Sequence, residues 1–122
     1  MDIIKVAIAD EHKNFRKGVI LSLKPYHNIK FVLEAENGEE LIQGVENADP
    51  DIILMDLKMP VKDGIETTKY INKHFPSIRI LILTMYEAER LVGNLMDSGA
   101  NGILLKGTEP KEIKQGIRSA MR

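Results

Sequence analysis

Three carboxylates stand at the ends of apolar runs, where they could bind a cation and a phosphoryl group. Asp10 and Glu11 follow "VAIA", and Asp56 ends "IILMD". Burial disfavours the charged form of an acid, so acids at the tips of core strands imply a shared task. Oxygen ligands without His or Cys favour Mg²⁺ over zinc, and Mg²⁺ keeps sites for waters and phosphate oxygens. These residues predict an open magnesium site.

Such a cluster needs positive charge. Carboxylates about 5 Å apart repel by roughly 3 kcal/mol at an effective dielectric near 20, so without help some would be protonated. Lys106, after "GILL", is one counter-charge, and a divalent cation is the better one. With a metal bound, Asp56 is a plausible nucleophile for phosphoryl transfer. Lys106 would then pair with one phosphoryl oxygen, and Thr84, at the end of another apolar run, would donate its hydroxyl to a second.

The turn after Asp56 is also shaped for this chemistry. Pro60 keeps the preceding backbone extended, which can direct the carbonyl of Lys58 at the metal. The histidines, in contrast, show no metal-ligand spacing and are expected on the surface; they are His12, His27 and His74.

Five short apolar runs alternate with amphipathic stretches and predict five strands in series. The candidates are Ile3–Ala9, Ile29–Ala35, Ile52–Met55, Ile78–Leu83 and Gly102–Leu105. The first, third and fourth are almost continuously apolar, which is typical of parallel strands covered on both faces. The second alternates more and suits an edge of the sheet.

Helical spacing fills the stretches between the strands. Apolar residues recur four positions apart in several groups, namely Phe15, Val19 and Leu23; Leu41 and Val45; Leu91 and Leu95; Ile113, Ile117 and Met121. Asp63 can cap the third helix, and Gly99 suits a left-handed stop to the fourth. Such β-α units with right-handed crossovers give a parallel sheet with helices on both faces. The functional crevice of that sheet lies beyond the carboxyl ends of its strands.

Composition narrows the class of protein. A chain of 122 residues can bury one core. Its net charge is −1, from 17 basic and 18 acidic residues, with no block of like charge, which argues against direct binding of nucleic acid. It has no cysteine, no apolar run long enough for a membrane span and no signal-peptide pattern. We therefore expect a soluble, cytoplasmic domain without a membrane partner.

The motifs resemble the receiver domain of two-component response regulators over all 122 positions. The matching segments are "IADEH", "PDIILMDLKMPVKDG", "ILILTMYEAE" and "SGANGILLKG". "LTMY" and the ending "LLKGTEPKEIKQGIRSA" are similar to the NarL/FixJ-like subgroup. The resemblance implies a flavodoxin-like (βα)5 fold, with a five-stranded parallel sheet of order 2-1-3-4-5 and helices on both faces.

The resemblance also implies a role for each site residue. Asp56 would accept a phosphoryl group from the phosphohistidine of a sensor histidine kinase. Glu11, Asp56 and the carbonyl of Lys58 would bind Mg²⁺, with Asp10 acting through water. Thr84 and Lys106 would hold the phosphoryl oxygens. Such a domain catalyses its own phosphorylation and slow dephosphorylation and is not a multiple-turnover metabolic enzyme.

The subgroup further implies an output through transcription. Its members usually carry a C-terminal helix-turn-helix, so residues 1–122 would be the receiver domain and DNA would be bound by a domain outside them. Homodimerisation on phosphorylation is left open. The chain has Ile103 where the family often has an aromatic switch residue, Gly107 where many receivers have proline, and Met85 after the threonine. Bulky Lys58 and Tyr86 would flank the approach of water and predict slow self-dephosphorylation.

Three other functions share features with this sequence. An aspartyl-phosphate phosphatase of the haloacid-dehalogenase kind needs a second acid two residues after the nucleophile, and that position holds Lys58. A flavodoxin-like cofactor binder needs a glycine- or hydroxyl-rich first loop, whereas "DEHKNFRKG" is acidic. A degenerate receiver that acts only as a protein-interaction module is the remaining alternative, which the presence of all the family's site residues disfavours.

Overall fold

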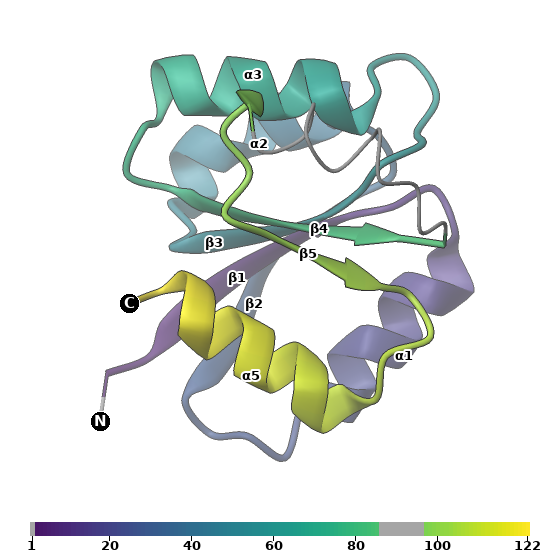
Figure 1. Ribbon diagram of the computed structural model, residues 1–122, viewed down its shortest axis with the longest axis vertical. Coiled ribbons are helices and arrows are strands. Elements are labelled where there is room, and N and C mark those ends of the chain that lie inside the picture. The colour runs from purple at the N-terminus through teal and green to yellow at the C-terminus, as the bar shows by residue number, and fades with distance from the viewer. Residues whose placement is uncertain (1, 86–96) are drawn as a thin grey trace.

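The computed structural model describes residues 2–85 and 97–122, which form a parallel sheet between two helical layers (Figure 1). The strands are β1 (Ile4–Ala9), β2 (Ile29–Ala35), β3 (Ile52–Asp56), β4 (Arg79–Thr84) and β5 (Gly102–Leu105). The described helices are α1 (Lys13–Leu23), α2 (Gly38–Ala48), α3 (Gly64–His74) and α5 (Pro110–Ala120). All strand pairs are parallel, and the strand order is β2-β1-β3-β4-β5, as predicted.

The strand predictions agree with the structure to within one residue. β2 and β5 have the predicted bounds, whereas β1 begins one residue later and β3 includes Asp56. β4 is shifted by one residue and ends at Thr84. The three almost continuously apolar strands, β1, β3 and β4, are interior, and β2 is an edge, as its alternation predicts. The predicted helix with Leu91 and Leu95 lies outside the described residues.

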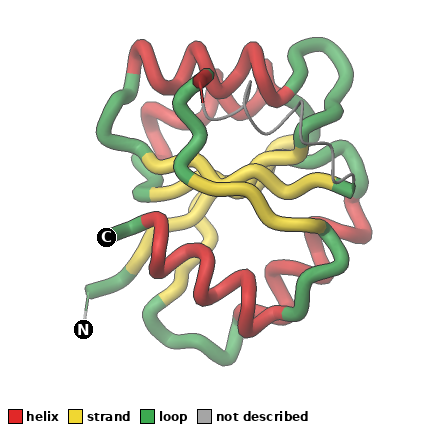
Figure 2. Tube along the Cα trace, viewed as in Figure 1, coloured by secondary structure: helices red, strands yellow, loops and turns green. Residues whose placement is uncertain are grey.

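Two hydrophobic clusters lie on opposite faces of the sheet, and Figure 2 shows the strands as a layer between the helices. Successive strand side chains point to opposite faces. In β3, Ile53 and Met55 therefore pack on the side of α2 and α3, whereas Ile52 and Leu54 pack on the side of α1 and α5. With both faces covered, every residue of β3 is buried.

Two residues singled out as local signals in the sequence, Asp63 and Gly99, have the expected conformation. The Asp63 side chain accepts a hydrogen bond from the backbone N–H of Glu66 at 2.9 Å, so it caps α3 as expected. Gly99 has φ +109°, in the positive range that favours glycine. In Figure 1 both chain ends lie at the side of the sheet opposite the carboxyl ends of the strands. Within the described residues, no helix has the length and apolar character needed to cross a membrane.

Candidate functional site

The strands deliver three of the predicted side chains to the same face of the sheet. In β1 and β3 the residues that pack toward α1 and α5 are Val6, Ile8, Ile52 and Leu54. Continuing this alternation by two residues leads to Asp10 and Asp56. Leu104 of β5 packs on the same side, and two residues later the chain reaches Lys106. The alternation of the strands therefore brings the two acids and the lysine together. Thr84 continues the alternation of Ile80 and Ile82 of β4, which pack on the opposite side of the sheet.

Lys106 joins the two acids through a pair of buried contacts. Its Nζ lies 2.6 Å from Oδ2 of Asp10 and 3.3 Å from Oδ2 of Asp56. The side chains of Asp10, Asp56 and Lys106 are only 1%, 8% and 9% exposed. The ammonium group also lies 4.6 Å from the centroid of the Phe15 ring, where a cation is attracted to the face of an aromatic ring. Lys106 is therefore the counter-charge that the acids require.

Asp10 is held by the backbone that follows it. Its Oδ1 accepts a hydrogen bond from the backbone N–H of His12 at 2.8 Å, and Nδ1 of the His12 ring lies 3.1 Å from the same oxygen. Its Oδ2 is buried and pairs with the ammonium group of Lys106. A buried carboxylate oxygen needs positive charge beside it, so this position also suits a bound cation.

The acidic surroundings change the protonation of Asp56. Burial, followed by the nearby charge of Asp10, raises the pKa of Asp56 above its ordinary value of 3.8. The ammonium group of Lys106 and a backbone hydrogen bond from Lys58 oppose this rise in pKa, but they do not cancel it. The sequence predicts this balance of two repelling acids and one compensating lysine.

A hollow of about 240 Å³ opens above the buried pair. Its lining includes five of the predicted site residues, which are Glu11, Asp56, Lys58, Thr84 and Lys106. His12, Leu57 and Met85 complete the lining. Asp10 lies beneath the hollow, because it is only 1% exposed.

The third acid is placed differently from the other two. Asp10, His12 and Asp56 offer ligand atoms that all lie within 4.8 Å of one another, and Glu11 is not in that group. Glu11 is exposed and lines the hollow. The expectation that His12 is a surface residue is correct, since its side chain is 60% exposed. Its closeness to the acid pair in the sequence allows an influence on these acids, and the structure shows the contact of its ring with Asp10.

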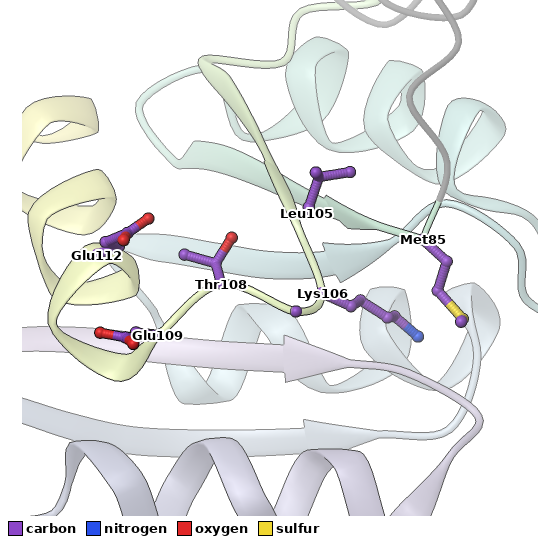
Figure 3. Close-up of a pocket in the computed structure, with 7 residues that line it drawn as sticks. Met85, Leu105, Lys106, Thr108, Glu109 and Glu112 are labelled. Carbon is purple, nitrogen blue, oxygen red and sulfur yellow. The ribbon is translucent and has the colours of Figure 1, made fainter.

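A second hollow, of about 500 Å³, adjoins the first (Figure 3). Met85 and Lys106 line both hollows, and Thr108, Glu109 and Glu112 line only the second. Figure 3 shows the Lys106 side chain extending away from Glu109 and Glu112, so its charge serves the buried acids. Met85 is 69% exposed and stands between the two hollows. Tyr86, predicted to flank the site, lies outside the described residues.

The donor set fits a hard divalent cation. Two buried carboxylates lie at the base of the hollow and a third acid lines its wall, without any thiolate. Oxygen-rich sites of this kind suit Mg²⁺ or Mn²⁺. The cluster of Asp10, His12 and Asp56 could thus hold a metal ion. Such a site also leaves room for a small anionic group beside Thr84 and Lys106.

Comparison with known proteins identifies the family. The model of the response regulator receiver domain matches residues 6–118. Transcriptional regulatory protein DegU of Brevibacillus brevis is 33% identical over 117 residues, which make up 94% of this chain and 49% of DegU. Response regulator protein VraR of Staphylococcus aureus is 36% identical over 119 residues, which make up 98% of this chain and 57% of VraR. The chain thus spans about half the length of the curated relatives that it matches.

Solved structures agree with the sequence comparisons. The receiver domain of the response regulator NarL from Mycobacterium tuberculosis has a TM-score of 0.94 at 26% identity, covering 99% of this chain and 98% of that one. The isolated REC domain of RcsB from Salmonella enterica serovar Typhimurium has a TM-score of 0.88 at 32% identity, covering 96% and 87%. The sequence of this chain, its strand order and the acids at its strand tips lead to one conclusion: it belongs to the response regulator receiver domains of two-component signalling.

Proposed function

We propose that this chain is a phosphorylation-activated switch, in which Asp56 accepts a phosphoryl group from a sensor histidine kinase. The observation that carries the proposal is the buried triad of Asp10, Lys106 and Asp56 beneath a hollow that is open to solvent. A structural ion pair would not require two repelling acids on one lysine.

In the proposed reaction, an Asp56 carboxylate oxygen attacks the phosphorus atom in line with the leaving group. A new O–P bond forms, and the bond from phosphorus to the donor breaks, with its electron pair leaving on the histidine nitrogen of the kinase. The strand holds Asp56 still, which is what an in-line attack requires. Lys106 and Thr84 line the same hollow, and they would hold phosphoryl oxygens.

The site is proposed to work with Mg²⁺. Asp56, Glu11 and the carbonyl of Lys58 would hold the ion, and Asp10 would act through a water molecule. When bound, Mg²⁺ would neutralise charge on the phosphoryl group. The raised pKa of Asp56 has a consequence here, since the carboxylate must be deprotonated both to bind a metal and to attack phosphorus.

We propose that the phosphorylated form controls transcription in the cytoplasm through a DNA-binding domain outside residues 1–122. DegU is a transcriptional regulatory protein, and RcsB has been solved bound to a promoter in the presence of a phosphomimetic. Both proteins are longer than this chain. Sedimentation of the phosphorylated chain would show whether two phosphorylated copies associate.

Phosphate incorporation tests the proposal. The chain should gain one phosphoryl group, seen by intact mass, when incubated with acetyl phosphate and Mg²⁺. Both EDTA and Asp56→Asn should abolish the gain, whereas Glu46→Gln, an exposed acid on α2, should not change it. Absence of phosphate on the wild-type chain would support the alternative of a degenerate receiver. Metal-dependent multiple turnover of phosphate esters would support a phosphatase instead.

A further inference from the structure

Arg16 of α1 is a buried cation that the proposed phosphorylation chemistry does not use. Its side chain is only 7% exposed. Its Nη1 donates a hydrogen bond of 2.5 Å to the backbone carbonyl of Asp10, and its Nε donates one of 3.2 Å to Oε1 of Glu34 on β2. Burying a guanidinium group is costly unless it is paired with good geometry. Arg16 is nevertheless buried beside the acid pair Asp10-Glu11, where its two hydrogen bonds offset the cost of burial.

Glu34 is itself held in position. Lys17, the next residue of α1, lies 2.8 Å from the other carboxylate oxygen of Glu34. The hydrogen bond from Lys17, the largest cause, and that from Arg16 hold the pKa of Glu34 below its ordinary value despite some desolvation. Glu34 therefore stays charged and can orient the guanidinium group from the edge strand.

The contact with Asp10 completes the anchoring of its backbone. The N–H of Asp10 donates to the carbonyl of Ala35 at 3.0 Å, and its carbonyl accepts from Arg16. That carbonyl belongs to the peptide group that leads directly to Glu11. Because a peptide group is planar and rigid, fixing its oxygen also fixes the direction in which the chain enters Glu11.

We infer that Arg16 is a positioning residue for the acid pair Asp10-Glu11 and that Glu34 orients it. This inference rests on the proposed function, since it assigns Arg16 to the metal site of that function. Groups that orient metal ligands without touching the ion typically change metal affinity by 10- to 100-fold when they are removed. Arg16 acts here on the backbone between two ligands, and a lysine cannot replace its forked donor.

The test compares Mg²⁺ affinity across matched variants of the chain by isothermal titration calorimetry. Arg16→Met should weaken Mg²⁺ binding roughly tenfold. It should also raise the Mg²⁺ concentration that gives half-maximal phosphorylation by acetyl phosphate, while the rate at saturating Mg²⁺ approaches that of the wild type. Lys24→Met removes an exposed lysine at the far end of α1 and leaves the contacts of Arg16 in place, so its Mg²⁺ affinity should stay within about twofold of wild type.

Several outcomes would overturn the inference. A folded Arg16→Met chain with wild-type Mg²⁺ affinity would do so, as would full restoration of affinity by Arg16→Lys. Should Arg16→Met fail to fold, Glu34→Gln decides, because it removes only the charge that orients the guanidinium group. Its Mg²⁺ affinity should fall several-fold, and an unchanged affinity would reject the inference. If the wild-type chain binds no Mg²⁺ and takes no phosphate, the proposed function fails as well, so the two failures can be told apart.

Discussion

Lys106 forms its shorter ion pair with Asp10, whose Oδ2 lies 2.6 Å from the ammonium nitrogen. The corresponding distance to the proposed phosphoryl acceptor, Asp56, is 3.3 Å. The lysine therefore neutralises the more deeply buried acid first. Asp56 keeps a raised pKa and lines the hollow. This arrangement suits a nucleophile that acts once a cation is bound.

Replacing Lys106 should reveal how far the fold depends on this charge. Without metal, Lys106→Met leaves two buried carboxylates with no lysine partner, and the free energy of unfolding should fall by about 3 kcal/mol. Saturating Mg²⁺ should restore part of that loss, since a bound cation replaces the missing charge. Urea unfolding in EDTA and in Mg²⁺ measures both effects. Lys17→Met is the control, because its half-exposed ion pair with Glu34 should contribute less than about 1 kcal/mol.

The protonation of Asp56 should make stability depend on pH. Its folded-state pKa is raised above 3.8, so between the two values the folded protein binds more protons than the unfolded chain. The free energy of unfolding therefore falls as pH rises through that range. Asp56→Asn removes the effect and should be more stable than wild type by about 1–2 kcal/mol at neutral pH without metal. The difference should vanish below pH 3.8, and a constant difference at every pH would contradict the assignment.

The exposed side chain of Lys58 should lengthen the life of the phosphorylated state. Lys58 lines the hollow, where a bulky side chain obstructs water approaching the phosphorus atom. In Lys58→Ala the acyl phosphate should decay several-fold faster, as measured by loss of the phosphorylated mass after the donor is removed. Lys69→Ala, an exposed lysine of α3, should decay at the wild-type rate. Equal decay in all three chains would show that Lys58 does not shield the site.

Gly64 should be required for the close approach of α3 to β3. An added Cβ would lie 2.6 Å from the backbone oxygen of Asp56 and 2.9 Å from Cα of Leu57, and neither backbone atom can move without displacing the site. Gly64→Ala should lower the free energy of unfolding by about 2 kcal/mol. At Gly107 an added Cβ meets nothing within 4 Å, so Gly107→Ala should change stability little. Thermal unfolding of both variants makes the comparison.

The sequence determined most of the architecture, because the bounds of each strand follow from residues that are near one another in the chain. The strands were predicted to within one residue, since continuous apolar runs have few ways to be buried. β2 was predicted as an edge from its alternation, and the structure confirms this. The positions of the candidate site residues were also predictable, because Asp56, Thr84 and Lys106 each stand at or directly after the end of such a run. Parallel strands then bring their carboxyl ends to one edge.

Only the tertiary structure decided how these groups share their charges. Three features depend on the distances between side chains, which the sequence does not give. Lys106 lies closer to Asp10 than to Asp56, Glu11 lies apart from the close acid group, and His12 contacts Asp10. The role of Arg16 was also hidden. Its place in the sequence marks Arg16 only as a polar residue of a helix. Its burial arises because the start of α1 packs beside the carboxyl ends of β1 and β2, where Arg16 reaches Asp10 and Glu34. Electrostatic energies vary steeply with distance and burial, and neither is written in the order of residues.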